Sequence, residues 1–458
     1  MEFRALVALL ESHGELLTVR REVDRNYELP ALLAQAESRE KAVRFENVSG
    51  SDYPVVGGVL TSLRRWAMGL GLPLASFDEP NALDNYVAGA VASPLPANVT
   101  DGGAVAEVVI RGGDIDTGKL PAPLFFSGDS HPFISAGLGF ARDPSSGQQN
   151  VGFYRVPVID RRRISLSAGP TSHLRVIYKA HGESGKKLQV ALAVGVPPAL
   201  QIAAAADLPA GISDVDVAGA LQRKPLEMVR CQTSDIMVPA DAEFVLEATV
   251  NLDDWVDNVM GEFGDQYGKT NSPTAMIDAI THRRDPMFHV IMAGMNREHN
   301  FLGRMLGYHL RAGILDNLGE PFPTVRDLCI DMTPQRTGMR AQVIVSVDKE
   351  SDDEPRAIID AIYAMQFGRF PLSMLMYRIV VVDQDVDIRD HREIDWAIAS
   401  RMNSAQQFLV YEDKTGRGAA VTRLGYDATA PIGLRDALRR PDIPGEEQYR
   451  LDDYLLDD

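Results

Sequence analysis

The sequence contains very few cysteines. Its 458 residues include only Cys231 and Cys329, which do not stand in Cys-x-x-Cys spacing. Small secreted proteins depend on several disulfides, and thiolate zinc sites depend on clustered cysteines. We therefore expect a protein of a reducing compartment that holds no zinc through thiolates.

Long apolar runs and an excess of positive charge are also absent. The first 21 residues mix charged with apolar side chains, and no later run reaches the ~18 apolar residues that a membrane span needs. The formal net charge is −18, from 46 Lys and Arg against 64 Asp and Glu. Such a chain has no overall positive field that would attract nucleic acid or an anionic membrane. The sequence predicts a soluble, cytoplasmic protein without a nucleic-acid or membrane partner.

Three common ligand-binding motifs are incomplete. Residues 264–270 have three residues between their glycines, where a phosphate-binding P-loop needs four. Residues 137–142 carry Arg142 where a dinucleotide fingerprint has its third glycine, and residues 383–394 carry Ile388 where a calcium loop has its glycine. These segments do not predict nucleotide or calcium binding.

Hydrophobic residues make up 45% of the chain and charged residues 24%, as in globular proteins, and the length suggests two to four domains. Apolar residues of the first turns, from Phe3 to Leu10, recur at helical spacing, and a short strand is predicted at Leu16 to Val19. From about Asn98 to Val250, short Val- and Ile-rich segments alternate with Gly, Pro and Asp clusters, which is typical of a strand-rich unit.

The remaining pattern is more helical. We predict a helix over Thr274–His282 and a second from Glu298 to about Leu315, which would connect two domains with a boundary near 300–320. Beyond Pro321 the pattern predicts, in order, a strand, a helix, a strand and a helix at 342–347, 354–367, 378–382 and 391–402. This alternation favours a second layer of mixed α and β structure.

Candidate polar residues concentrate in the strand-rich half. If the segment after the turn 143–147 is a strand, Arg155 shares a face with Val151 and Phe153. That arginine could be functional, or it could be an edge-strand residue whose side chain reaches solvent. Five carboxylates crowd 253–265 and could form a solvated turn or a site, and His173 taken alone is more often structural.

The order of the motifs resembles one family almost from end to end, that of the UbiD-type decarboxylases. The matching segments are Glu22-Val-Asp24, Ala42-Val-Arg-Phe-Glu-Asn-Val-Ser-Gly50, Arg142-Asp-Pro-Ser-Ser-Gly-Gln-Gln-Asn-Val-Gly-Phe-Tyr-Arg155, Leu188-Gln-Val-Ala-Leu-Ala-Val-Gly-Val-Pro-Pro198, Ser213-Asp-Val-Asp-Val-Ala-Gly219, Met237-Val-Pro-Ala-Asp-Ala-Glu-Phe-Val-Leu-Glu247, Gly261-Glu-Phe263, Asp387-Ile-Arg-Asp-His-Arg-Glu-Ile-Asp-Trp-Ala-Ile-Ala-Ser-Arg401 and Thr422-Arg-Leu-Gly-Tyr-Asp-Ala-Thr429.

The resemblance implies an α+β fold in three parts. Residues 1–300 would form the cofactor-binding catalytic domain, with a flavin-reductase-like split β-barrel within about 100–260. Residues 301–320 would form a linker helix, and residues 321–458 a C-terminal α/β oligomerisation domain. The implied activity is reversible, non-oxidative decarboxylation of an aromatic, heteroaromatic or α,β-unsaturated acid with prenylated FMN.

Site residues are implied in the same way. The family's metal ligands fall on Asn150, His173 and Asp214, which would hold Mn²⁺ or Mg²⁺ next to the cofactor phosphate, with K⁺ as a further candidate ion. A basic residue near that phosphate corresponds to Arg423. The family commonly has Glu where this chain has Asp214.

The family's catalytic arginine corresponds to Arg155 and its acid to Glu262. A further carboxylate five residues earlier corresponds to Asp257, where the family commonly has Glu. Arg155 would bind the substrate carboxylate, Asp257 would hold the guanidinium, and Glu262 would return a proton to the carbon that loses carbon dioxide.

The implied partners are a carboxylic acid substrate, carbon dioxide, a flavin prenyltransferase that supplies the cofactor, and further copies of the chain in a homodimer or hexamer. Two alternatives stay open. One is a non-catalytic relative that serves as an assembly module, and the other is a metallohydrolase that uses the carboxylates of 253–265. The sequence indicates neither the substrate nor the direction of the reaction.

Overall fold

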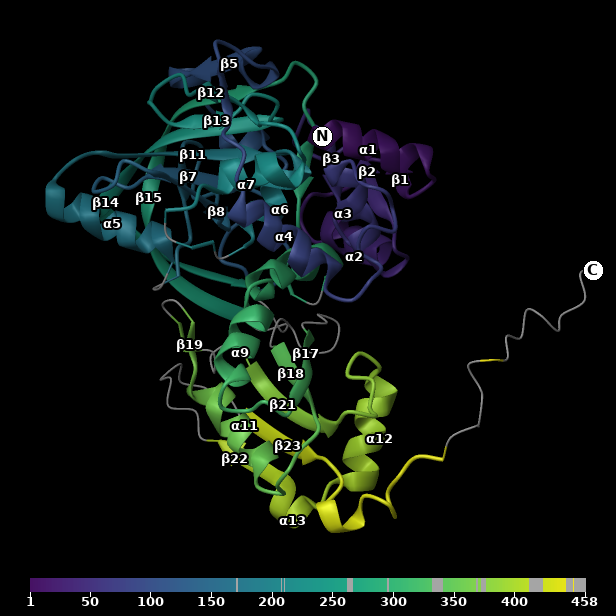
Figure 1. Cartoon of the computed structure of the whole chain (residues 1–458). Coiled ribbons are helices and arrows are strands. Elements are labelled where there is room, and N and C mark those ends of the chain that lie inside the picture. The colour runs from purple at the N-terminus through teal and green to yellow at the C-terminus, as the bar shows by residue number, and fades with distance from the viewer. Residues whose placement is uncertain are drawn as a thin grey trace, which may run out of the picture. The chain divides into compact units, whose positions relative to one another are not determined.

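A computed structural model describes residues 1–169, 172–206, 208–209, 211–261, 267–294, 296–331, 341–367, 370–371, 376–411, 423–441 and 448. The chain forms two compact units (Figure 1). The first contains residues 1–310, and the second contains residues 311–331 and 341–458. Each unit is described by itself.

The first unit begins with a small mixed sheet in the order β1-β2-β3-β16. Its outer pairs are parallel and its central pair is antiparallel. The strands and the helices that accompany this part of the chain are α1 (Phe3–Ser12), β1 (Leu16–Val19), α2 (Glu28–Ser38), β2 (Ala42–Phe45), β3 (Val55–Gly57), α3 (Leu63–Leu70), α4 (Ala82–Ala92) and β16 (Phe288–Val290).

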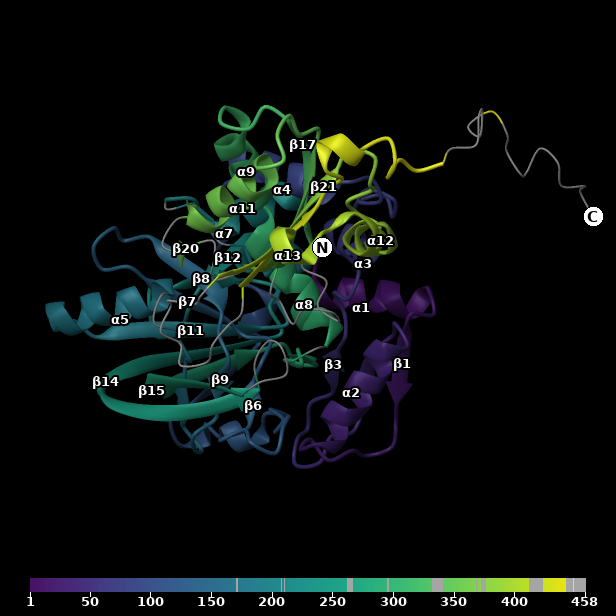
Figure 2. The ribbon, with the colours of Figure 1, turned by 90° about the horizontal axis from the view of Figure 1, so that it is seen from below.

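A seven-stranded antiparallel sheet forms the centre of the first unit. Its order is β10-β15-β14-β11-β7-β8, with β5 also paired to β15. The long hairpin of β14 and β15 dominates one side of the unit, and α5 lies beside it in two views (Figures 1 and 2). The strands are β5 (Val108–Arg111), β7 (Leu138–Arg142), β8 (Gln149–Phe153), β10 (Arg163–Ser165), β11 (Leu188–Val194), β14 (Phe244–Gly261) and β15 (Tyr267–His282).

Smaller elements complete the first unit. The short strands form one sheet in the order β13-β12-β4 and a separate pair of β6 with β9. Their bounds, and those of the remaining helices, are β4 (Asn98–Thr100), η1 (Ala104–Ala106), η2 (Gly112–Asp114), η3 (Thr117–Lys119), β6 (Phe133–Ile134), β9 (Val156–Pro157), α5 (His173–Ser184), α6 (Pro198–Ala204), α7 (Asp214–Leu221), β12 (Glu227–Arg230), β13 (Met237–Pro239), α8 (Arg297–Gly303) and η4 (Arg304–Gly307).

The central sheet lies between two hydrophobic cores. Successive residues of β11 belong to different clusters: Ala191 and Ala193 to one, Val190 and Leu192 to the other. Side chains of a strand point to alternate faces, so both faces of this strand are buried. A nearly continuous apolar segment, rather than an alternating one, is what such a central strand requires.

The second unit contains a five-stranded sheet in the order β17-β18-β21-β23-β22. Strands β18, β21 and β23 are parallel, and the helices α11 and α12 make the two crossovers between them. Parallel neighbours need such a crossover. The elements are α9 (Leu310–Gly319), β17 (Val325–Asp331), β18 (Ala341–Val347), α11 (Glu354–Ala364), β19 (Gln366–Phe367), β20 (Phe370–Pro371), β21 (Met376–Asp383), α12 (His391–Arg401), α13 (Ser404–Gln407), β22 (Phe408–Tyr411), β23 (Arg423–Ala428) and η6 (Ile432–Leu434).

Two of the helix predictions are corrected by the structure. Thr274–His282 is the second half of β15, not a helix, and Ala275, Ile277 and Ala279 are buried while Met276 is exposed. Pairing with β14, β10 and β5 supplies this segment with backbone partners, which outweighs its local helical pattern. The predicted continuous helix of 298–315 is divided into α8, η4 and α9.

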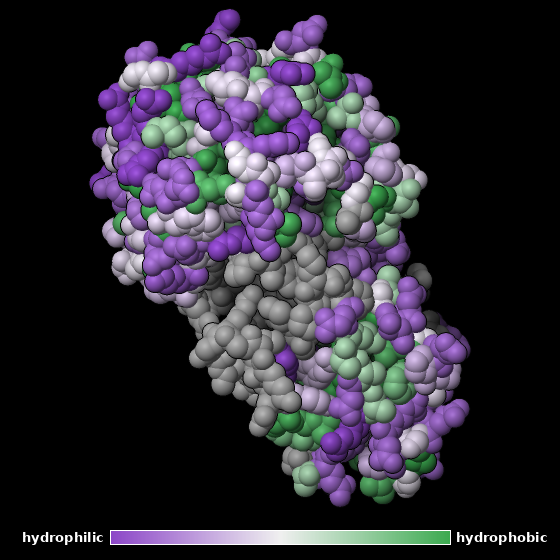
Figure 3. All heavy atoms as spheres, turned by 90° about the vertical axis from the view of Figure 1, so that its left-hand side faces the viewer, coloured by the Kyte–Doolittle hydropathy of each residue, from purple (hydrophilic) through white to green (hydrophobic). Residues whose placement is uncertain are grey.

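Other elements agree with prediction. The first helix and strand are present as α1 and β1, and the order strand, helix, strand, helix is present as β18, α11, β21 and α12. The mixed α+β class is therefore confirmed at this coarse level. No helix within the described ranges is long and apolar enough to cross a bilayer. On the face of the first unit seen in Figure 3, polar side chains predominate and apolar ones are scattered.

Candidate active site

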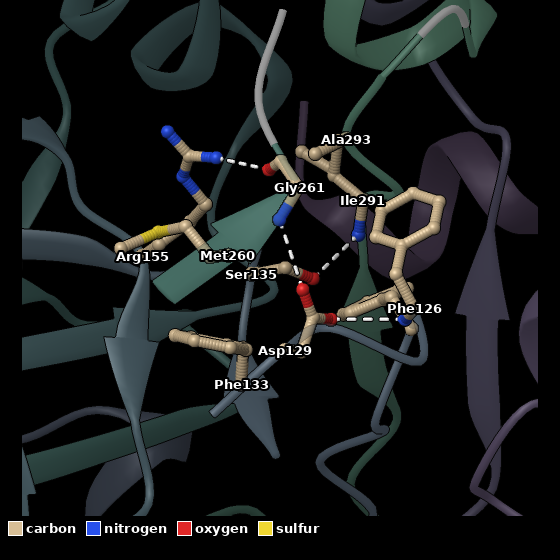
Figure 4. A pocket seen from close by; sticks show the side chains of 10 residues that line it. Phe126, Asp129, Phe133, Ser135, Arg155, Met260, Gly261, Ile291 and Ala293 are labelled. Carbon is tan, nitrogen blue, oxygen red and sulfur yellow. Dashed lines mark hydrogen bonds between the residues drawn. The ribbon is translucent and has the colours of Figure 1, made fainter. Parts of the chain in front are cut away.

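A small pocket opens in the first unit beside the end of β14 (Figure 4). The space between its atoms is about 230 Å³, part of it open to solvent. Most of the lining is apolar and comes from Phe125, Phe126, Phe133, Met260 and Ile291. Among the described residues of the lining, Asp129 and Arg155 carry the charges.

Arg155 lies two residues after the end of β8 and is half-buried. Its backbone forms an isolated bridge with Ser167, and its Nη1 donates a 2.5 Å hydrogen bond to the carbonyl oxygen of Gly261. The sequence left open whether this arginine is a surface residue. The structure places it among the residues that line the pocket, with its guanidinium bonded to the backbone of Gly261.

Asp129 is a pocket residue that the sequence analysis missed. Its Oδ1 accepts a 2.9 Å hydrogen bond from the N–H of Gly261, and its Oδ2 accepts one of 2.9 Å from the N–H of Phe126. Burial raises the pKa of Asp129, whereas these donors and the charge of Arg155 oppose that shift. No local pattern could reveal this role, since Gly261 lies 132 residues away along the chain.

His299, on α8, belongs to the electrostatic surroundings of Arg155. Burial, assisted by the positive charge of Arg155, lowers the pKa of His299 to about 3. Its ring is therefore neutral near pH 7. His299 therefore adds no positive charge to the surroundings of Arg155 at that pH.

The structure does not bring Asp257 to Arg155. Asp257 is exposed on β14, where it forms a 2.8 Å ion pair with Lys269 and accepts a 2.8 Å hydrogen bond from Asn271. The hydrogen bond from Lys269 is the main cause of its lowered pKa. On this strand Asn258 and Met260 are buried, so Asp257 lies on the opposite face. The role predicted for Asp257 stays a prediction that these contacts do not support.

Glu262, the predicted proton donor, lies outside the described residues, next to Gly261. Among the other carboxylates of this segment, Asp254 contacts Arg163 and Thr274, and Asp253 is exposed. Within the described ranges, no group of three or more His, Cys, Asp or Glu side chains could hold a metal ion. The described carboxylates of 253–265 therefore give no support to a metallohydrolase.

The three predicted metal ligands lie on adjacent elements of the first unit. Asn150 is on β8, which pairs with β7, and α5 packs against β7. His173 is the first residue of α5, and Asp214 is the first residue of α7, which packs against β8. Ser172 and Ser213 cap these two helices and fix where each begins.

The donor set suits a hard divalent cation. Asn150 donates through its Nδ2 to the Tyr154 hydroxyl at 3.2 Å, and no described residue donates to its amide oxygen. That oxygen, an imidazole and a carboxylate are ligands that Mn²⁺ and Mg²⁺ accept. Arg423, the predicted phosphate partner, is buried at the start of β23 in the second unit, paired with Tyr411 of β22.

Comparison with known proteins gives matches along nearly the whole chain. Three family models match, described as the N-terminal, Rift-related and C-terminal domains of 3-octaprenyl-4-hydroxybenzoate carboxy-lyase, over residues 7–79, 98–296 and 304–426. An uncharacterised protein of Rhodospirillum rubrum is 30% identical over 95% of this chain and 92% of its own length.

Two solved structures are similar in both sequence and fold. The UbiD-class enzyme HmfF of Pelotomaculum thermopropionicum, in complex with FMN, is 32% identical over 99% of this chain and 100% of its own, with a TM-score of 0.84. An evolved dimeric form of that enzyme, in complex with prFMN, is also 32% identical over the same shares, with a TM-score of 0.81.

Proposed function

Because the chain belongs to the UbiD family of carboxy-lyases, we propose that it catalyses the reversible, non-oxidative decarboxylation of a small carboxylic acid with prenylated FMN. The acid is aromatic, heteroaromatic or α,β-unsaturated. The observation that carries this proposal is the placement of Arg155 in a pocket lined mainly by apolar and aromatic side chains.

The pocket chemistry suits such an acid. Arg155 offers a guanidinium to a carboxylate, and Phe125, Phe133 and Met260 offer apolar surface to a planar ring or alkene. An aromatic or unsaturated acid would therefore meet both a counter-charge and apolar surface in this pocket.

The donor set of the metal trio supports a cofactor phosphate held through Mn²⁺ or Mg²⁺. We assign Asn150, His173 and Asp214 to the metal and Arg423 to the phosphate, with K⁺ as a further candidate ion. HmfF, at 32% identity, has been solved with FMN and with prFMN. When bound, prenylated FMN supplies an electron sink for the electrons released as carbon dioxide leaves.

The protein's own groups then have separate tasks. Arg155 binds and orients the substrate carboxylate and compensates for its loss of water. Glu262, which follows Gly261 in the sequence, delivers a proton to the carbon that loses carbon dioxide. In the reverse direction the same residue removes that proton, and the concentration of carbon dioxide sets the direction.

The proposal extends to architecture and assembly. We assign the cofactor domain to residues 1–300 with a flavin-reductase-like split β-barrel within about 100–260, a linker to 301–320, and oligomerisation to 321–458. An evolved form of HmfF is dimeric, and we propose a homodimer, or a hexamer built from dimers, for this chain. A flavin prenyltransferase would supply the cofactor, and the cytoplasm is the expected compartment.

The test is coexpression of the chain with a flavin prenyltransferase, followed by purification and a screen of benzoate-, pyrrole-, indole- and cinnamate-type acids. We expect a flavin-like absorbance, bound Mn²⁺ or Mg²⁺, and carbon dioxide release from at least one acid. Arg155→Ala is the matched variant. It should keep the flavin-like absorbance but release no carbon dioxide. A fully loaded parent that decarboxylates none of these acids would contradict the proposal.

A further inference from the structure

Gly261 is held from two sides in the pocket. Its N–H donates to Oδ1 of Asp129 at 2.9 Å, and its carbonyl oxygen accepts from Nη1 of Arg155 at 2.5 Å. Figure 4 shows Asp129 and Arg155 on different sides of this residue, each joined to it by one hydrogen bond. The side chains of Asp129 and Arg155 therefore both form hydrogen bonds with the residue at the end of β14.

The space at Gly261 leaves no room for a side chain. A Cβ atom at this residue would lie 2.4 Å from ring carbons of Phe126, closer than such atoms can approach. Phe126 in turn donates its N–H to Oδ2 of Asp129 at 2.9 Å. The carboxylate of Asp129 thus ties the Phe126 loop to the strand end, with one oxygen for each.

The charges agree with this geometry. Asp129 is half-buried, and the two backbone N–H groups that it accepts from oppose the rise in its pKa that burial causes. It shares the pocket with Arg155, whose positive charge acts on it. Asp257, in contrast, is exposed and paired with Lys269.

We propose that Asp129 is a positioning residue of this active site. By holding the N–H of Gly261, it fixes the carbonyl group that orients Arg155. Asp129 therefore takes the role of holding the guanidinium of Arg155 in place, which the family resemblance assigned to Asp257. This inference rests on the proposed function, because Arg155 takes its role from it.

The experiment is a double-mutant cycle on the full chain, read out by the binding of benzoate, an acid that carries a carboxylate on a single ring. In Asp129→Asn, one amide oxygen replaces two carboxylate oxygens, and the amide N–H₂ faces a backbone N–H. We expect benzoate affinity to fall by about tenfold or more, since truncating one partner of a buried charged hydrogen bond is costly.

The second arm of the cycle is Arg155→Ala. If Asp129 acts through Arg155, adding Asp129→Asn to Arg155→Ala should change benzoate affinity by less than about twofold, because coupled residues are not additive. Asp114→Asn, the same charge change at an exposed residue of the first unit, is the control and should bind benzoate like the parent. Asp129→Glu keeps the charge, and its benzoate affinity should lie between those of the parent and Asp129→Asn. If Asp129→Asn fails to fold, Asp129→Glu takes its place in the test.

Steady-state kinetics on the loaded enzyme complete the test. Asp129→Asn should raise KM, because the arginine that binds the substrate carboxylate is oriented through Gly261. Unchanged benzoate affinity in Asp129→Asn, full additivity with Arg155→Ala, or no benzoate binding by the parent overturns the inference. A parent that binds benzoate but decarboxylates no acid contradicts the proposed function instead, and the binding cycle still decides the role of Asp129.

Discussion

Glu37 provides the sharpest prediction about stability. It lies on α2 and is 2% exposed, and its Oε2 accepts hydrogen bonds from the N–H groups of Arg297 at 2.6 Å and Glu298 at 3.4 Å. These are the first two residues of α8, the helix that carries His299. The other oxygen, Oε1, is buried with no hydrogen-bond partner among the described residues.

Burial, and then the neighbouring carboxylate of Glu298, raise the pKa of Glu37 from 4.5 to about 8. Between these two values the folded protein keeps a proton that the unfolded chain has already released. Raising the pH through this window must therefore lower the free energy of unfolding. The stabilising contribution is fully present below pH 4.5 and is lost as the pH passes about 8.

The perturbation is Glu37→Gln, which keeps the shape and one acceptor oxygen but cannot ionise. A one-proton difference is worth about 1.4 kcal/mol per pH unit, so between about pH 5.5 and 7.5 the parent should lose roughly 3 kcal/mol relative to the variant. At about 2.1 cal/mol/K of unfolding entropy per residue, the first unit of roughly 310 residues should show a relative Tm change of about 5 °C.

The assay is thermal melting of parent and variant at both pH values. Glu40→Gln is the control, because Glu40 is an exposed carboxylate that pairs with the same Arg297 at 3.0 Å. That control should keep the pH dependence of the parent, since Glu37 is intact in it. If the Tm difference between the parent and Glu37→Gln is the same at both pH values, the ionisation of Glu37 is not coupled to folding and the reasoning fails.

Three further predictions concern the site and the assembly. Gly261→Ala should lower kcat/KM by about tenfold or more, because its Cβ would lie 2.4 Å from the Phe126 ring, and normal kinetics would contradict that contact. His173→Ala should lower both metal and flavin content, by metal analysis and absorbance, and full occupancy would remove His173 from the ligand set. Light scattering should return a dimer or hexamer, and a 50.1 kDa monomer at micromolar concentration would refute the assembly.

The sequence predicted local elements well where periodicity and packing agree. The stripe from Phe3 to Leu10 is buried in α1, and the second unit follows the predicted order of strands and helices. It was wrong for Thr274–His282, since the partners that make this segment a strand are distant in sequence. A short stretch of sequence does not reveal with which distant strand it will pair.

The candidate site was only partly predictable for the same reason. Motif order pointed to Arg155, which lines the pocket, whereas the metal-binding role of Asn150, His173 and Asp214 stays a prediction. It assigned Asp257 by spacing alone. Strand alternation places Asp257 on the exposed face of β14, where Lys269 neutralises it. Asp129 carries no motif, and its importance appears only when the chain has folded around Gly261.

The measurement that tests the central claim most directly is carbon dioxide release by the cofactor-loaded enzyme in deuterated buffer. The account predicts that the parent forms a product with deuterium on the carbon that lost carbon dioxide. In Glu262→Gln, turnover should fall by roughly 10²–10⁴-fold while flavin and substrate stay bound. If the loaded parent releases no carbon dioxide from any acid, or if Glu262→Gln incorporates deuterium as fast as the parent, the account is contradicted.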